Sequence, residues 1–559
     1  MAVNRRDGWD GGKCKPTIIF LAEESGVLST SDFADNGFVN GGRGIAGQSA
    51  GPLRTPAWPR RRNRDAAACL ELPTAKALLF TLQWMVVGLI GLVCHVILVR
   101  EVGPACFAIL MAALLFLHRR NPLAGFLVYL QILLYQNVAI SLFTSKMVAA
   151  DYTLLSGTSF IGGLVLVSGP AFRMLQSRRP FQSSHRGVIG TMHYVCIAIA
   201  VALAYTAYGA LTAAPTAAVV GFRNATVILF AVIIGLDIGD TWGYRTVATC
   251  FLASAAFGVV LAVLEIADPV WYLTLINAAD FGNLKNSLSV KAHLFSADNL
   301  IDTMLSLPFN TELLSFLMPG LTYRFGGPNL HSISYGYVLA VTELVLLSLG
   351  QVGLALPLLL SFLIGVKGSA ILFGATVLLY LIWRGTASVK MLLSCGTLLA
   401  TVYVAYGVWS GLRAGDYHVI GFLGGVNGFL ENPLGHGAGV GGNLSLGSLD
   451  AKKWEEYQHS GANVGLESAV GVLLYQLGVG CLAIIAAFVT LLRSGPFGIK
   501  WRKPKATDIL FIGFGIGLVN GVFQEEAYSP YAVGLLALFC GILVANGQRS
   551  SRLLDSNRI

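Results

Sequence analysis

The sequence from Ala77 onward is a succession of apolar runs, each bounded by Arg, Lys or Gly/Pro residues. A helix of about 20 apolar residues spans the hydrocarbon core of a bilayer, whereas a membrane β-strand needs only about 10 residues of alternating polarity. The runs are continuous and of spanning length, so they predict helices. Hydrophobic residues make up 55% of the chain and charged residues 12%, which excludes an ordinary soluble protein. The predicted fold class is all-α: a polytopic integral membrane protein.

We expect about 14 transmembrane helices of roughly 20 residues each, some of them shorter because they are re-entrant or interrupted. They begin near Ala77, Pro104, Pro122, Thr153, Val188, Arg223, Thr246, Ile333, Val352, Ser369, Lys390, Glu467, Asp508 and Pro530. If both termini are cytoplasmic, this even count places every strongly basic link on the cytoplasmic side, in agreement with the positive-inside rule. The basic links are 118–120, 173–186, 384–390, 493–505 and the tail with Arg549 and Arg552.

The first 70 residues differ in composition from the rest of the chain. They are polar and Gly-rich and have no sustained apolar period, so 1–70 is predicted to be a disordered cytoplasmic extension. The apolar run that follows has no small-residue cleavage site after it, which predicts a retained helix and not a signal peptide. The membrane domain then covers 71–548, and a short cytoplasmic tail covers 549–559.

Charge and cysteine content exclude several other classes. The net charge is +9, but the basic residues concentrate in short links between apolar runs, so the charge reflects topology and predicts no nucleic-acid partner. The nine cysteines form no CxxC pair and most lie inside apolar runs. They predict neither a disulfide framework nor a metal site.

Two long segments fall on the outer side of the membrane in this topology, at about 266–332 and 410–466. A carrier normally has short loops and places ionisable residues within its helices. The long segments therefore favour an enzyme that works at the outer face, although they do not exclude a carrier. No internal repeat and no inverted pair of halves is evident in the sequence.

The second outer segment holds a glycine series and the candidate bases. The series Asn432-Pro-Leu-Gly435-His-Gly437-Ala-Gly439 lacks the strand and helix of a dinucleotide site. It would either let backbone amides approach an anionic ligand or serve as a flexible link. His459 is predicted to lie at the membrane surface, where an imidazole can accept and release a proton. Glu467 is expected in the first turn of the next helix, stabilised by its dipole. His436 is a second candidate base, ranked below His459.

Each of these residues also has a plain structural explanation. His459 would simply be solvated in an outer loop, and Glu467 would be an ordinary charge at a helix N-terminus.

Basic residues on the outer side are the exception to the positive-inside rule, so they are the best candidates for binding an anion. Arg324 precedes a Gly-Gly-Pro-Asn329 turn, which would hold it in a fixed direction. Lys367 interrupts a long apolar stretch, where it needs a partner, a water-filled cavity or a route to the surface by snorkelling. Arg223 and Arg413 are also expected at outer helix ends. Together these cations would suit a diphosphate.

Asp237 and Asp240 fall at an inner end in this topology. They are interpreted as ordinary loop charges.

Four segments together resemble the bacterial O-antigen ligase and Wzy-type polysaccharide polymerase superfamily. They are the turn Arg324-Phe-Gly-Gly-Pro-Asn329, the step Gly365-Val-Lys367-Gly-Ser, the glycine series 432–439, and His459-Ser followed by Glu467-Ser-Ala-Val-Gly471. The resemblance covers roughly 320–480. It departs from the family pattern in two places, because Lys367 stands where the family has Arg and no Asn follows His459.

The resemblance implies a metal-independent glycosyltransferase that uses an undecaprenyl-diphosphate-linked glycan and no nucleotide sugar or other cofactor. It would reside in the bacterial inner membrane with 266–332 and 410–466 as periplasmic loops. His459 would be the base, Glu467 its helper, and the cations would bind the diphosphate. Block transfer by a Wzy-like polymerase is the first hypothesis. A ligase that transfers the glycan to lipid A core is the near alternative, and an export carrier or flippase is the alternative from another class. The bilayer, a chain-length co-polymerase and a flippase would be its partners.

Overall fold

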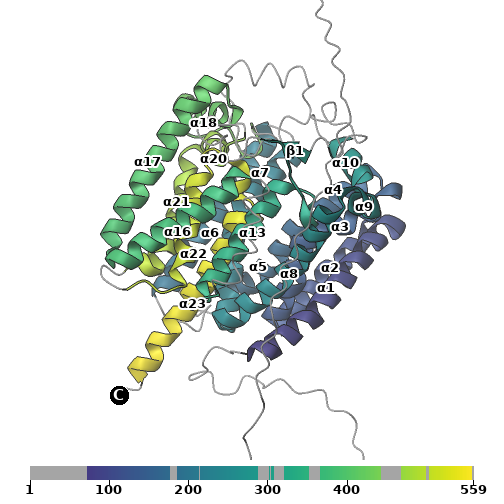
Figure 1. Cartoon of the computed structure of the whole chain (residues 1–559), viewed down its shortest axis with the longest axis horizontal. Helices are drawn as coiled ribbons and strands as arrows, with labels where there is room; N and C mark the ends of the chain where they lie inside the picture. Colours follow the sequence, from purple (N-terminus) through teal and green to yellow (C-terminus); the bar gives the residue numbers. More distant parts are fainter. Residues whose placement is uncertain are drawn as a thin grey trace, which may run out of the picture. The chain divides into compact units, whose positions relative to one another are not determined.

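A computed structural model describes residues 72–176, 186–212, 215–287, 301, 304–306, 320–351, 366–441, 467–498 and 503–556. Within these residues, ten helices are long and apolar enough to cross a membrane. They are Thr74–Val102, Pro122–Ser141, Ala149–Ala171, Gly187–Thr212, Pro215–Gly239, Tyr244–Ala267, Lys367–Thr386, Val389–Ala414, Ala469–Ser494 and Glu525–Gly547. The chain is thus an all-α, multi-pass membrane protein (Figure 1).

The N-terminal half of the described chain is a series of long helices joined by short links. Its elements are α1 (Thr74–Val102), α2 (Ala105–Arg120), α3 (Pro122–Ser141), α4 (Ala149–Ser156), α5 (Thr158–Gln176), α6 (Arg186–Thr212), α7 (Pro215–Gly239), α8 (Tyr244–Ala267), α9 (Pro269–Leu275) and α10 (Ala278–Ser287). Local signals set several boundaries. Asn121 caps α3 by accepting from the amides of Leu123 and Ala124, and Pro122 occupies the first helical position, where no amide hydrogen is needed.

The C-terminal half alternates long helices with short ones. Its elements are β1 (Leu305–Ser306), β2 (Thr322–Tyr323), the 3-10 turn η4 (Gly327–Asn329), α13 (Ser332–Ser348), α16 (Lys367–Thr386), α17 (Val389–Ala414), α18 (Tyr417–Glu431), α20 (Ala469–Leu477), α21 (Cys481–Ser494), α22 (Asp508–Asn520), η9 (Glu525–Tyr528), η10 (Pro530–Gly534) and α23 (Leu535–Ser556). The two strands pair antiparallel, with Leu305 opposite Tyr323.

The ten spanning helices each correspond to an expected run. Of the other four, α2, α13 and α22 are shorter helices, with 16, 17 and 13 residues, and the helix expected near Val352 lies outside the described residues. The N-terminal extension 1–70 and the end of the C-terminal tail also lie outside them. Helices α9, α10 and α18 depart from the prediction, because they occupy residues of the two long segments that were expected to be loop.

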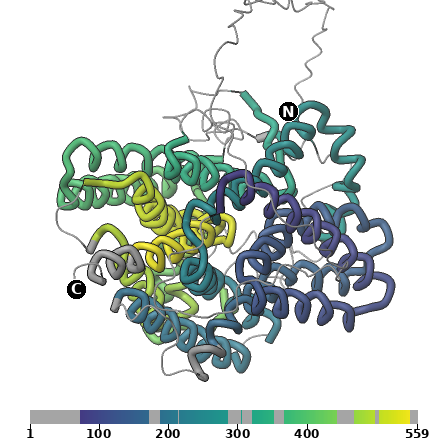
Figure 2. Tube along the Cα trace, turned by 90° about the horizontal axis from the view of Figure 1, so that it is seen from below, coloured from purple at the N-terminus to yellow at the C-terminus, as the bar shows by residue number. Residues whose placement is uncertain are grey.

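Close backbone packing joins α7 to α23, which pack along much of their length. A Cβ added to Gly541 would lie 2.8 Å from the Val232 carbonyl oxygen, and one added to Gly235 would overlap the Leu538 carbonyl. Small residues at such positions let membrane helices approach closely, since the hydrophobic effect cannot drive association within lipid. Figure 2 shows the yellow C-terminal helices enclosed by the green and blue ones. Helix α17, by contrast, has few fully buried residues.

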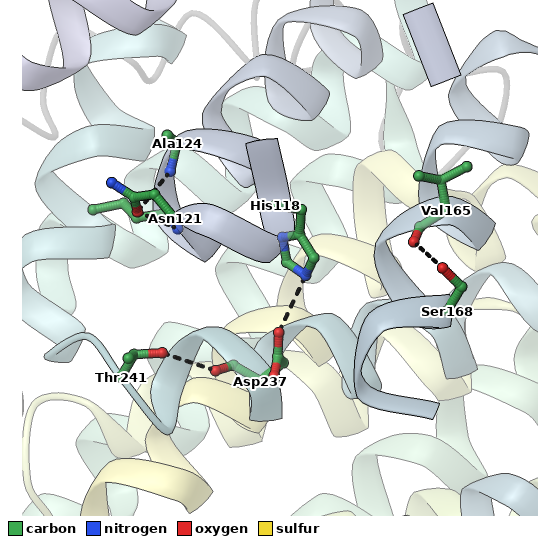
Figure 3. Close-up of polar contacts among 8 residues, drawn as sticks. His118, Asn121, Ala124, Val165, Ser168, Asp237 and Thr241 are labelled. Carbon is green, nitrogen blue, oxygen red and sulfur yellow. Dashed lines mark hydrogen bonds and ion pairs between the residues drawn. The ribbon is translucent and has the colours of Figure 1, made fainter. Parts of the chain in front are cut away.

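A buried contact between a histidine and an aspartate joins α2 to α7. His118 Nε2 lies 3.1 Å from Asp237 Oδ2, and both side chains are almost fully buried (Figure 3). The interpretation of Asp237 as a loop charge is therefore wrong: it lies two residues before the end of α7, inside the last turn of the helix, and faces another helix. Only Asp240, which follows α7, lies beyond a helix end.

Candidate functional site

The segment before α13 places Arg324 through two backbone interactions. Strand β2 pairs with β1, and the Arg324 amide donates to the Met304 carbonyl oxygen at 2.9 Å. The Arg324 side chain is half-buried. Burial lowers the pKa of its guanidinium from the ordinary value, while the nearby Tyr417 acts in the opposite direction. A cation held in this way is stabilised by binding an anion.

Glu265, near the end of α8, fixes the turn that follows Arg324. Its carboxylate accepts hydrogen bonds from the amides of Gly326 (2.9 Å) and Gly327 (2.7 Å) and from the Tyr323 hydroxyl (2.9 Å). The side chain is fully buried. Sequence reasoning missed Glu265, although a carboxylate near the end of an otherwise apolar run was a visible signal.

The turn itself is buried and specific. Gly327 has φ +53°, and a Cβ there would lie 2.6 Å from the Tyr335 ring. Asn329 is buried within the turn, and its carbonyl accepts a 2.6 Å hydrogen bond from the Asn137 side chain on α3. Asn329 therefore lies in a framework position that joins α3 to the start of α13.

Lys367 is the first residue of α16, and a buried amide holds this helix start in place. The Asn520 side chain at the end of α22 donates to the Gly368 carbonyl at 2.9 Å and to the Tyr337 hydroxyl at 2.8 Å. It accepts from the Tyr403 hydroxyl on α17 at 3.0 Å. Because Asn520 is fully buried, these hydrogen bonds are shielded from competing water. They hold the start of α16, and with it the backbone of Lys367, in place.

The two cations belong to one electrostatic group. Lys367 interacts with the charges of both Asp416 and Arg324. Tyr417, next to Asp416, interacts with Arg324, Glu467 and Glu526. The structure thus brings together Arg324 and Lys367, which sequence analysis had paired, and adds Asp416 and Tyr417, which it had not considered.

Helix α18 supplies a histidine to this cluster. Asp416 caps the helix by accepting from the His418 amide at 2.9 Å. His418 Nδ1 lies 3.1 Å from the Glu467 carbonyl oxygen and 3.8 Å from its carboxylate. Sequence analysis missed His418 as well. The Asp at the helix start was a local signal for the helix, but the contact with a residue far along the chain was not readable from it.

Glu467 was expected in the first turn of a helix, but it lies before the helix begins. The N-cap of α20 is Ser468, whose hydroxyl accepts from the Gly471 amide at 2.9 Å and donates to the Val522 carbonyl at 2.6 Å. Glu467 precedes this cap with φ +49°, a left-handed conformation that few residues other than glycine adopt. Its buried side chain is therefore placed by the turn and not by the helix dipole.

The glycine series packs against the chain's own helices. Gly435, Gly437 and Gly439 are buried, with φ between +80° and +100°. A Cβ on Gly437 would lie 2.7 Å from Gly209 in α6, and one on Gly439 would overlap the Ala217 carbonyl in α7. Neither explanation offered from the sequence holds here, because the space that a side chain would fill is taken by neighbouring helix backbone and not by solvent or a ligand.

His436 is held within this packed series. Its Nδ1 lies 3.1 Å from the Tyr475 carbonyl, and its ring stacks on that of Tyr475 at 4.0 Å with an interplanar angle of 8°. These contacts give it a structural role. The other candidate base, His459, lies outside the described residues.

The two remaining arginines, Arg223 and Arg413, lie in different settings. Arg223 lies eight residues into α7, because the helix begins at Pro215 and not near Arg223. It interacts there with Glu525. Arg413 is in the last turn of α17 as expected, but it is exposed and lies 4.1 Å over the Trp409 ring.

No group of three His, Cys, Asp or Glu side chains in the described part of the chain is arranged to hold a metal ion. No family model, curated protein or solved structure matches the chain. The motifs and the geometry of the cluster are therefore the basis for a functional assignment.

Proposed function

We propose that the chain is an inner-membrane protein with about 14 crossings, cytoplasmic termini, and periplasmic segments at 266–332 and 410–466. The distribution of basic links supports this. Arg119 lies near the end of α2, directly after His118. The His118 side chain contacts Asp237 in the last turn of α7. Arg384 at the end of α16 follows Trp383, which stacks on Phe497, four residues after Arg493. Lys367 is the first residue of α16 and Arg384 lies in its last turn, so the basic end of this helix is opposite the Arg324–Lys367 cluster, as a cytoplasmic face requires.

On this basis the cluster faces the periplasm, and its chemistry is that of glycosyl transfer from a polyprenyl-diphosphate donor. The single observation that carries this proposal is the association of half-buried Arg324 and Lys367 with Asp416 at a junction of helix ends. Two cations at the bilayer surface suit a lipid diphosphate, because an Arg fork and a Lys point charge can share its oxygens.

The reaction would proceed by attack of an acceptor hydroxyl on the donor's anomeric carbon. The bond from that carbon to the diphosphate oxygen breaks, and Arg324 and Lys367 stabilise the charge that develops on the leaving group. A base removes the hydroxyl proton. The sequence resemblance assigns that base to His459, with Glu467 beside it. We propose that the reaction is the polymerisation of repeat units into exopolysaccharide or O-antigen, in company with a flippase and a chain-length co-polymerase.

A deletion strain tests this function. Loss of long polymer with a single repeat unit still attached to its acceptor would support polymerisation. Complete polymer left on the lipid carrier would instead indicate a ligase, and repeat units trapped in the cytoplasm would indicate a flippase. Purified protein in lipid nanodiscs should lengthen a lipid-diphosphate-linked repeat unit without any nucleotide sugar, and failure to do so would contradict the proposal.

A further inference from the structure

The hydrogen bond between His418 and Glu467 determines where the imidazole carries its proton. A carbonyl oxygen can only accept, so the 3.1 Å contact with the Glu467 carbonyl requires the hydrogen on Nδ1. In the neutral ring Nε2 then has a free lone pair. Among the described residues Nε2 has no hydrogen-bond partner. The side chain is 22% exposed, so the ring is not sealed inside the protein.

Glu467 is held firmly enough to orient this ring. Its neighbour Ser468 is bonded to Val522, and the Val470 amide donates to the Gly521 carbonyl at 3.1 Å. The left-handed backbone of Glu467 turns its carbonyl toward His418. Such strained conformations persist where the surrounding structure fixes them, and they concentrate at functional sites. The Glu467 carboxylate, 3.8 Å from Nδ1, would also stabilise the ring once it is protonated.

The same imidazole follows directly after the two residues that interact with the cations. The rings of Tyr417 and His418 are 4.4 Å apart, Tyr417 interacts with Arg324, and Asp416 interacts with Lys367. Asp416 and Tyr417, the two residues before His418, thus interact with Glu467 before α20, with Glu526 in η9, and with the two cations. A base next to a diphosphate site is the arrangement that attack on the adjacent anomeric carbon needs.

We infer that His418, oriented by Glu467, is the base that removes the acceptor's proton, in place of His459. This inference rests on the proposed glycosyl transfer. The hydroxyl proton passes to His418 Nε2 as the new bond from the oxygen to the anomeric carbon forms. The electron pair of the broken bond leaves with the diphosphate, and the imidazolium then releases its proton to water. Glu467 is a positioning residue in this step.

The decisive variant is His418→Asn. The Asn amide nitrogen can replace Nδ1 as the donor to the Glu467 carbonyl, but it supplies no base, so the fold is kept while proton transfer is lost. We expect turnover to fall by about 10² to 10⁴ while the dissociation constant for the lipid-diphosphate donor changes less than threefold. His418→Ala should regain activity when imidazole is added. The matched control, His193→Ala, removes an exposed imidazole on α6 and should keep most of its activity.

The outcomes separate the inference from the function that it rests on. Near-normal turnover by His418→Asn would overturn the inference, and if His459→Ala were then inactive, the glycosyl transfer would stand with His459 as its base. Loss of donor binding in His418→Asn, or loss of turnover in His418→Ala that imidazole does not restore, would also overturn it. If the wild-type protein does not turn over the donor at all, the proposed function fails first.

Discussion

The Glu265 carboxylate accepts a 2.7 Å hydrogen bond from the Gly327 amide and so joins the end of α8 to the turn that follows Arg324. Two residues before that turn, Arg324 is fixed by its own bond to Met304. A buried carboxylate on a spanning helix thus sets the direction of the cation that we propose binds the donor.

Glu265→Gln should impair this arrangement. The amide retains one acceptor oxygen but loses its charge, so the bonds from Gly326 and Gly327 weaken. Hydrogen bonds to a charged group contribute about 1.5 to 3 kcal/mol each, and we expect both a lower melting temperature in detergent and a weaker affinity for the lipid-diphosphate donor. Glu101→Gln, at an exposed ion pair with Arg100, is the control. An unchanged donor affinity would show that the turn does not depend on Glu265.

Removal of either clustered cation should reduce polymer formation. Arg324→Ala and Lys367→Ala should each lower donor affinity while the protein still inserts in the membrane, because each leaves part of the diphosphate charge uncompensated. Lys367→Arg should be tolerated. Arg413→Ala should have little effect, since Arg413 is exposed against Trp409. Polymer length in complementing strains measures all four, and full-length polymer from Arg324→Ala would reject the diphosphate role.

The His118–Asp237 pair should stabilise the bundle. Removing one side chain leaves the other buried without the group that compensates it, which typically lowers the free energy of unfolding by about 3 to 5 kcal/mol. We expect His118→Leu or Asp237→Leu to lower the melting temperature strongly, and the double variant to recover part of the loss because no charge remains buried. Thermal unfolding in detergent checks this. Equal losses that simply add in the double variant would show that the two side chains act independently.

The spanning helices could be predicted because their signal is local: length and hydropathy suffice for a run such as Val389–Ala414. Helix starts were less predictable. Arg223 was taken for a helix end because a charge usually marks the interface, yet it lies inside α7, where Glu525, far along the chain, provides a counter-charge.

The candidate site was predictable only in part, for the same reason. Arg324 and Lys367 were identifiable as cations on the outer side of an apolar protein. The roles of His418 and Glu265 were not readable, although Glu265 itself was visible as a charge, because these roles depend on Glu467 and on the turn at Gly327, which lie 49 and 62 residues away in sequence. The glycine series was misinterpreted because sequence cannot distinguish backbone approach to a ligand from backbone approach to another helix.

That last distinction is testable with Gly439→Ala. Gly439 has φ +85°, and an added Cβ would overlap the Ala217 carbonyl in α7. A left-handed conformation alone costs a residue with a side chain roughly 1 to 2 kcal/mol, and the overlap adds to it. We expect a clear loss of thermal stability. Gly515→Ala is the matched control, because it has no atom within 4 Å of an added Cβ. Equal stability of the two variants would contradict the packing role.

The last prediction concerns the side of the membrane on which each loop lies in the proposed topology. Helix α17 ends just before Asp416 of the cluster, and α18 continues from there into the second long segment, whereas α21 ends near the basic Arg493. A periplasm-dependent reporter fused after Gly447 should therefore be active, and the same reporter fused after Lys500 should be inactive, because one helical span separates the two positions. A cytoplasm-dependent reporter should give the reverse pattern. Activity of the periplasmic reporter at the second position but not at the first would place the cation cluster in the cytoplasm, where an undecaprenyl-linked repeat unit on the outer leaflet could not reach it.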